Sequence, residues 1–438
     1  MFIDCTAPFR TCLNLASGVH QRRSRANDLL KRIGPDRLAE GTCELHWCGA
    51  DDRRRFERYA HEGEDDVPPV FTPLALMTGS ALTPDVLLPA GVGLSDVHVE
   101  LHDNTIALAR FRLEGQGVPR FVASGDYSAV SHAIAVSIVQ KASPLIGVLL
   151  GTLLEAQKTA PRRDRIILAP AEYQVFADIA DLVGETGAVV WNEPPVLWTN
   201  RTVVAADEIE LIDVGHGAGL RRLPSPIHGH DFRYRFEVGS VFVVADAPSY
   251  EGSGYRKVMG WLQMFSAQLD VLRREFPTAP PDIDRGRGEA FIHRLNAIKR
   301  YANALTDTYV DLSLGVQHER RHLLDAIAEC FEIDRLIAIT RGRVATVIDQ
   351  VTDLRAAANA RARSLFEKAA FALAALTVVD IVINLLWFTK GDYQPETEWP
   401  AWSQAPLEMV RGFSSDTAIL LTVVCILVLL TLRLGARE

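Results

Sequence analysis

Residues 369–388 read AAFALAALTVVDIVINLLWF, an apolar run that is interrupted by Asp380 and Asn384. Its length matches the roughly 20 residues that a helix needs to cross about 30 Å of hydrocarbon. A second apolar run, TAILLTVVCILVLLTL at residues 417–432, is shorter, and it reaches a spanning length from about residue 412. The sequence therefore predicts two C-terminal transmembrane helices, joined by a polar outer loop at 389–416.

The charges beside the first run predict its orientation. Lys and Arg exceed Glu by a net +3 over residues 355–368, whereas residues 389–416 carry a net −3. An excess of Lys and Arg marks the cytoplasmic side of a span. We expect a multi-pass protein of the inner (plasma) membrane, with the soluble body and the C-terminus in the cytoplasm.

A long helix precedes the first span without a proline between residues 331 and 388. Its apolar positions alternate in steps of four and three, which predicts a helix buried along one seam. The series is Ile333, Ile337, Thr340, Val344, Val347, Val351, Leu354 and Ala358. A similar series, from Phe291 to Val316, and a helix at Tyr255–Phe276 complete a helical stalk region at 254–368.

Upstream of the stalk, residues 96–253 alternate between strand and helix signals, which predicts an α/β or α+β domain. Asp96–Leu113 has the period-2 pattern of a hairpin around an Asp-Asn turn. Further strands are expected at Arg165–Leu168, Gly187–Trp191, Glu208–Val214 and Phe232–Ala245, and helices near Ser128–Lys158 and Ala171–Val183. We interpret residues 1–95 as a partly helical N-terminal segment.

The overall composition limits the possible partners. The chain has 438 residues and a net charge of −9, and this acidic balance argues against nucleic acid as a partner. Its six cysteines are scattered, and the close pair Cys43 and Cys48 has no second pair that would complete a zinc site. We expect structural thiols in a reducing compartment.

The sequence offers little support for an enzyme. His98 and His102 share one face of an expected strand, and His228, His230 and Asp231 form a loop cluster. Both groups fit hydrogen-bonded or surface histidines better than a metal site, which needs three or four convergent ligands. The glycine-rich stretch at 215–219 predicts a turn rather than a phosphate loop.

The polar residues inside the first span are the candidate site. Thr377, Asp380 and Asn384 fall within about 60° of one another at 100° per helical residue. Ionisable groups inside a span usually face a cavity, a pore or a partner. Two interpretations stay open: these side chains line an ion or water path, or they hydrogen-bond between helices and hold an oligomer together.

The order of these parts resembles the CorA-type divalent-metal transporter family, from about Val97 to the end and most closely from Tyr255 onward. The family's Gly-Met-Asn motif at the outer end of the first span is absent. Thr389-Lys390-Gly391-Asp392 stands in its place, and the connecting loop is longer than the family's. The resemblance implies a pentamer whose first span lines the pore, with Mg²⁺ or another divalent cation as the transported or regulatory ion.

Two functional hypotheses follow. The first is a CorA-like homo-oligomer that passes cations past Thr377, Asp380 and Asn384, with Gly391 and Asp392 as outer-mouth residues. Asp349 and Asp353, one helical turn apart, are weak candidates for a regulatory cation, and a solvated helix face is the alternative. The second is a membrane-anchored sensor or effector, whose soluble domain binds a ligand or partner while its spans anchor and oligomerise it.

Overall fold

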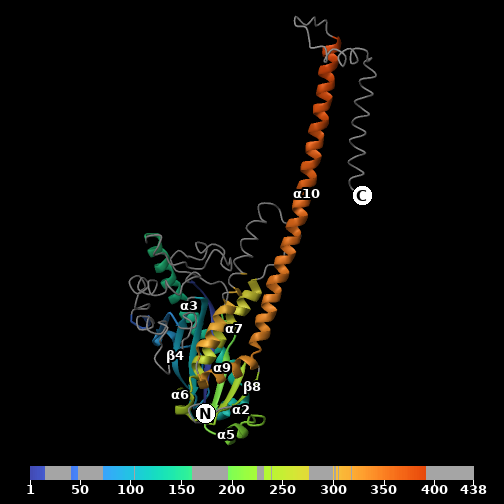
Figure 1. The fold of residues 1–438 in the computed structure, drawn as a ribbon. Helices are drawn as coiled ribbons and strands as arrows, with labels where there is room; N and C mark the ends of the chain where they lie inside the picture. Colours follow the sequence, from blue (N-terminus) through green and yellow to red (C-terminus); the bar gives the residue numbers. More distant parts are fainter. Residues whose placement is uncertain are drawn as a thin grey trace. The chain divides into compact units, whose positions relative to one another are not determined.

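The computed structural model describes residues 1–14, 41–47, 73–102, 104–159, 196–223, 231–237, 239–275, 299, 302–303, 305–316 and 318–390. The chain divides into two compact units, Met1–Asp349 and Gln350–Glu438. The first unit is α/β: a mixed sheet with helices packed on it (Figure 1). In the second unit, the described residues are those of one helix.

The described residues of the first unit contain one sheet, in the order β2-β3-β4-β5-β1-β6-β9-β8-β7. The strands are β1 (Phe2–Asn14), β2 (Glu44–Trp47), β3 (Ala75–Thr78), β4 (Gly93–Leu101), β5 (Asn104–Glu114), β6 (Asn200–Ala205), β7 (Arg221–Arg222), β8 (Arg233–Glu237) and β9 (Ser240–Val244). All neighbouring pairs are antiparallel except β6 and β9, which are parallel.

The helices cover both faces of this sheet. The helices whose bounds the structure gives are η4 (Ser80–Leu82), α2 (Val118–Ser124), α3 (Tyr127–Thr159), α5 (Glu208–Asp213), α6 (Ala247–Gly252), α7 (Tyr255–Glu275), α9 (His318–Cys330) and α10 (Ile333–Lys390), which belongs to the first unit only up to Asp349. Because side chains alternate along a strand, β5 contributes to two cores. Ala107, Ala109 and Phe111 join the core beneath α3, whereas Ile106 and Leu108 join the core beneath α7.

The predicted hairpin at Asp96–Leu113 is confirmed by the antiparallel pairing of β4 and β5. The N-terminus differs from our expectation. Phe2–Asn14 is a strand between β5 and β6, near the centre of the sheet, so it belongs to the same body as the rest. Ile3, Cys5, Ala7 and Phe9 are buried at every second position, with Asp4, Thr6 and Pro8 between them, which is the period-2 pattern of a strand. Within the segment 1–95 that we expected to be partly helical, Glu44–Trp47 and Ala75–Thr78 are strands as well, and residues 15–40 and 48–72 lie outside the described residues.

Two strand predictions need correction. The predicted strand at Glu208–Val214 is wrong, because residues 208–213 form α5. A capping box starts this helix: Glu210 N donates to Asp207 Oδ1 at 2.8 Å, and Ala206 N donates to Glu210 Oε2 at 2.9 Å. The stretch Phe232–Ala245 is two strands, β8 and β9, and Gly239 between them has φ +74. The strands expected near 165–168 and 187–191, and the helix near 171–183, lie outside the described residues.

The helix predicted near Ser128–Lys158 is confirmed as α3. Within the described residues, its stretch Tyr127–Thr152 is the one helix long and apolar enough to cross a membrane, and 50% of it is buried. Ile134, Ile138 and Ile146 pack into the core against the sheet. Such burial is typical of a core helix. Packing against the sheet therefore explains the apolar composition of α3 without a membrane.

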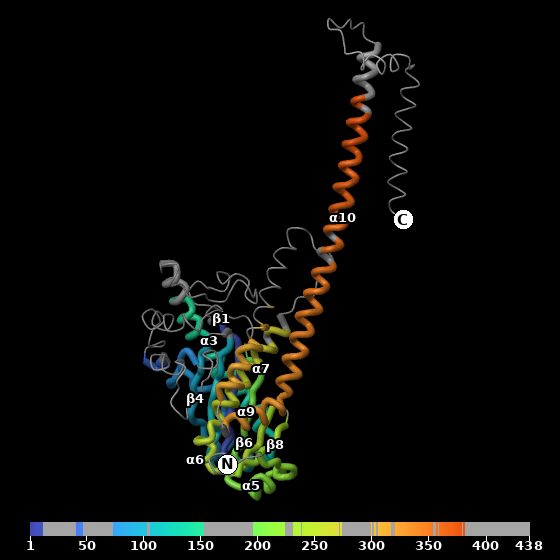
Figure 2. The backbone as a smooth tube through the Cα atoms, in the orientation of Figure 1, coloured from blue at the N-terminus to red at the C-terminus, as the bar shows by residue number. Residues whose placement is uncertain are grey.

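The helices predicted around the stalk pack on the other face. α7 confirms the helix expected at Tyr255–Phe276, and α9 lies beside it (Figure 2). The first four members of the 4-3 series on α10 are all buried: Ile333, Ile337, Thr340 and Val344. The members of the earlier series that the structure describes also pack into this core: Ala302, Leu305, Tyr309, Leu312 and Val316. The 4-3 spacing thus predicted which faces of these helices are buried.

The second unit is described for residues 350–390, the continuation of α10. The helix has 58 residues, so it extends about 87 Å at 1.5 Å per residue. Large apolar side chains on this part are exposed in the single chain: Leu365, Phe366, Leu373, Leu376 and Ile381. The predicted second span, the outer loop from residue 391 and the tail lie outside the described residues.

Candidate functional site

A layer of charged side chains lies between the sheet and α7. Arg112 on β5 donates from Nε and Nη2 to the two carboxylate oxygens of Asp4 on β1, at 2.8 and 3.1 Å. Arg112 also pairs with Glu251, and Arg256 at the start of α7 pairs with Asp96. Asp4 is 5% exposed, so this pair of hydrogen bonds is largely shielded from solvent.

Glu100 on β4 is the centre of the same layer. Its carboxylate lies 2.9 Å from Arg110 Nε and 3.7 Å from a ring nitrogen of each of His98 and His102. Burial alone raises the pKa of Glu100, but the charge of Arg110 and the two histidines reverse that effect, so its pKa lies well below its usual range. Burial favours the neutral ring of His98, yet hydrogen bonds to Asp96 and Glu100 raise its pKa.

A glycine on α7 makes this charged layer possible. A Cβ atom on Gly260 would overlap the guanidinium of Arg110. Without that atom, Arg110 Nη1 reaches the carbonyl oxygen of Arg256 and donates to it at 3.0 Å. The layer thereby ties α7 to three strands. Its carboxylates and guanidinium groups pair with one another, so we interpret it as structural.

His98 Nδ1 lies 3.1 Å from the carbonyl oxygen of Asp96, whereas neither ring nitrogen of His102 has a hydrogen-bond partner among the described residues. His98 and His102 share a face, as predicted, and both point at Glu100. Among the described residues, no group of three or more His, Cys, Asp or Glu side chains could hold a metal ion. His228 and His230 lie outside the described residues. The glycine-rich stretch is a turn after α5, with positive φ at Gly215 and Gly219.

Among the cysteines whose side chains the structure describes, Cys5, Cys43 and Cys330 are free. Cys5 and Cys43 are buried, and burial raises the pKa of both thiols. A thiol that stays protonated is a poor nucleophile and a poor metal ligand, so these two side chains serve packing. Cys48, the predicted neighbour of Cys43, lies outside the described residues.

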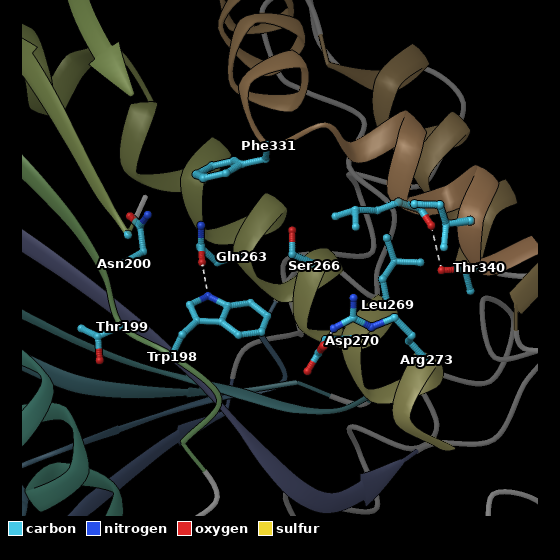
Figure 3. A pocket seen from close by; sticks show the side chains of 13 residues that line it. Trp198, Thr199, Asn200, Gln263, Ser266, Leu269, Asp270, Arg273, Phe331 and Thr340 are labelled. Atoms are coloured by element: carbon cyan, nitrogen blue, oxygen red, sulfur yellow. Dashed lines mark hydrogen bonds and ion pairs between the residues drawn. The ribbon is translucent and has the colours of Figure 1, made fainter. Parts of the chain in front are cut away.

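A pocket of about 360 Å³ opens between the start of β6, α7 and the first turns of α10 (Figure 3). Its apolar walls are Trp198, Leu269, Phe331, Leu336 and Ile339. Its polar lining is Thr199, Asn200, Gly239, Gln263, Ser266, Asp270, Arg273 and Thr340. Although more polar than apolar residues line the pocket, most of its exposed wall is apolar surface. Such walls with polar groups among them are typical of small-molecule sites, which usually measure about 300–1,000 Å³.

The polar groups of the pocket differ in how well they are satisfied. Trp198 Nε1 donates to Gln263 Oε1 at 2.6 Å, and Arg273 Nη2 donates to Asp270 Oδ1 at 2.7 Å. Asn200 is 3% exposed, and its Oδ1 accepts no hydrogen bond from any described residue. A buried acceptor without a donor costs about 1–3 kcal/mol.

The predicted pore residues lie on α10 in the second unit. Thr377 and Asp380 are both exposed, and Thr377 Oγ1 donates to the carbonyl oxygen of Leu373 at 2.8 Å. Asn384 is one turn further along the same helix, and its side chain lies outside the described part of the chain. Gly391 and Asp392 lie outside it as well. Asp349 and Asp353 are exposed positions one turn apart on α10.

The sequence did not predict the pocket or the charged layer. The pocket combines residues 198–200, 263–273 and 331–340, which no local pattern connects. One sequence pattern does indicate the charged layer, because Arg110 and Arg112 alternate with apolar residues along β5. Glu100, on the neighbouring strand β4, pairs with Leu108 of β5. Comparison with protein-family models, with curated proteins and with solved structures gives no match.

Proposed function

We propose that this chain is an oligomeric membrane protein of CorA-like architecture that passes cations, with Mg²⁺ or a similar divalent ion as its cargo. The observation that carries the proposal is α10. Its first turns are buried in the core of the folded unit at Ile333 and Ile337, and the same helix continues without a break to Lys390. One helix thus joins the folded unit to Thr377 and Asp380.

Exposed apolar side chains support the membrane placement. Leu373 and Leu376 are each 66% exposed and Ile381 is 56% exposed, within a stretch that has few charges. Apolar area in water costs about 25 cal/mol per Å², so lipid, the returning span or a second copy of the chain around these side chains would stabilise the protein. The apolar run at 417–432 would supply the returning span, and the +3/−3 charge difference supports a cytoplasmic position for the folded unit.

The polar face of the first span supports ion passage. A ring of Asp380 carboxylates in a homo-oligomer, a pentamer by resemblance, would attract cations and repel anions. Thr377 and Asn384 lie on the same helix face one turn away, where they would offer oxygen ligands to a partly hydrated ion. Gly391 and Asp392 would form the outer mouth.

Cation flux into proteoliposomes tests this assignment. Asp380→Ala should abolish most of the flux, while the mass of the detergent-solubilised oligomer stays the same. Val378→Ala is the matched control, because it lies about 160° from Asp380 around the helix and should conduct like wild type. Equal flux in wild type and Asp380→Ala refutes the pore. Loss of the oligomer in Asp380→Ala would support the interhelical contact instead.

A second function is favoured by the pocket. A membrane-anchored sensor would bind its ligand in the folded unit and use its spans only to anchor and oligomerise. The pocket in Figure 3 includes residues from the first turns of α10, the helix that leads to the first span. A purified oligomer that conducts no cation, yet binds a small molecule in this pocket, would establish this second function over the first.

A further inference from the structure

We infer that a basic segment of α10, directly before the first predicted span, binds the headgroups of anionic phospholipids. The segment comprises residues 361–368 and carries Arg361, Arg363 and Lys368. The inference rests on the membrane placement in the proposed function, which puts these residues at the cytoplasmic surface of the bilayer. It does not require ion passage, because the segment precedes Thr377 and Asp380 on the helix.

The three cations of the segment are open to a ligand. Their side chains are exposed, and none of them forms an ion pair with another described residue. Together with the one carboxylate of the segment, Glu367, they give a net charge of +2. Clusters of Lys and Arg on the cytoplasmic side of a span attract anionic lipids. A lipid phosphate would supply the negative charge that this segment lacks.

The rise of the helix places these cations at the level of the lipid phosphates. Lys368 directly precedes Ala369, where the predicted span begins, and Arg363 and Arg361 lie about 9 and 12 Å before Ala369 at 1.5 Å per residue. The headgroups add about 5–8 Å to each side of the hydrocarbon. Both arginines are therefore within a Debye length, about 8–10 Å, of the phosphates. Their long side chains reach further toward that layer.

The cations lie on two sides of the helix. At 100° per residue, Lys368 is about 20° from Arg361 around the axis, whereas Arg363 is about 160° from it. In a homo-oligomer, one side of α10 would face a second copy of the chain. The opposite side would still present a cation to lipid, so headgroup binding does not depend on how the helix is rotated.

Two apolar side chains in the same segment fit the same partner. Leu365 is 66% exposed and Phe366 is 76% exposed. They lie about 6 and 5 Å before Ala369, at the boundary between headgroups and acyl chains, where apolar side chains leave water. Cations beside apolar side chains match the phosphate and the acyl chains of one lipid molecule. A free phosphate ion would use only the charged half of this surface.

Lipid binding to the full-length protein in nonionic detergent tests the inference, with native mass spectrometry to measure the bound lipid. The probes are phosphatidylglycerol, which is anionic, and phosphatidylcholine, which has no net charge. Each cation near the headgroups adds about a fivefold preference for anionic lipid. We therefore expect the wild type to bind phosphatidylglycerol about tenfold more tightly than phosphatidylcholine or better. The combined variant Arg361→Gln, Arg363→Gln and Lys368→Gln should lose most of this preference.

Two further variants are the matched controls. Arg341→Gln with Arg343→Gln removes two exposed cations of α10 that belong to the first unit, so the lipid preference should stay that of the wild type. Arg361→Lys with Arg363→Lys keeps the charge and should keep most of the preference. This second control separates loss of charge from a change in the helix.

Equal affinity of the wild type for the two lipids would overturn the inference. A preference that the three glutamine substitutions leave unchanged would also overturn it, as would an equal loss in the Arg341 and Arg343 control. The proposed function fails separately. A protein that prefers phosphatidylglycerol but conducts no cation keeps the lipid site and loses the pore. A protein that does not float with vesicles of either lipid loses the membrane placement that both proposals share.

Discussion

Removing the charge of Glu100 should strongly destabilise the first unit. Its carboxylate is 14% exposed and lies 2.9 Å from Arg110 Nε, with His98 and His102 at 3.7 Å. Removing one member of a buried ion pair costs about 3–5 kcal/mol, because the other charge stays buried without its partner. Glu100→Gln keeps the shape and one acceptor oxygen, so we expect about 2–4 kcal/mol.

The matched control is Asp85→Asn. Asp85 is 83% exposed and pairs with Lys141 at 2.9 Å, so it tests the loss of a carboxylate at the surface. Such a pair is worth about 1 kcal/mol or less. Urea unfolding of the full chain in detergent, followed by far-UV circular dichroism, measures both variants. Equal unfolding midpoints for Glu100→Gln and Asp85→Asn would refute our interpretation of the charged layer.

A double-mutant cycle makes the test sharper. Arg110→Met alone and Glu100→Leu alone should each destabilise the protein, because each leaves one charge buried. The double variant replaces both charges by apolar groups of similar volume, so it should be less destabilised than the two single changes combined, by about 1.5 kcal/mol or more. Additivity to within about 0.5 kcal/mol would show that the pair is not coupled.

Three further changes test other parts of the fold. Asp207→Ala removes the N-cap of α5 and should lower the free energy of unfolding by about 0.5–2 kcal/mol, measured by urea unfolding. Gly260→Ala should cost about 1–3 kcal/mol in the same assay, because its Cβ displaces Arg110, and an unchanged midpoint would contradict the close approach. Because the pKa of His98 is raised on folding, its stabilising effect is complete below the unfolded pKa of about 6.5 and is lost as pH rises through the folded value. Wild type should therefore lose stability above pH 6.5 more steeply than His98→Gln, and parallel pH profiles would contradict this.

Helices and the hairpin were predictable because their signals are local. The 4-3 spacing from Ile333 onward and the period-2 pattern of β4 and β5 each depend on residues close in sequence. The alternation of Ile3, Cys5, Ala7 and Phe9 was a strand signal that our sequence analysis overlooked, and the pairing of Asp4 with Arg112 is visible only when β5 lies beside β1. α5 was missed because its apolar residues suggested a strand, although Asp207 and Glu210 form a capping box.

The candidate site was less predictable for a different reason. Asn200, Gln263 and Phe331 come from three distant segments, and their meeting depends on how α7 and α10 pack beside β6. Glu100 alone would be interpreted as a surface residue of a strand. Only its contact with Arg110, permitted by Gly260, shows why a carboxylate is buried there.

Cation uptake by proteoliposomes that contain the wild-type protein tests the proposed function most directly. With Mg²⁺, Co²⁺ or K⁺ outside and an ion-sensitive dye inside, we expect uptake of at least one cation above that of protein-free liposomes. Chloride should not pass, because a ring of Asp380 carboxylates repels anions. Uptake that equals the protein-free level for every cation, from a correctly inserted oligomer, would contradict cation passage.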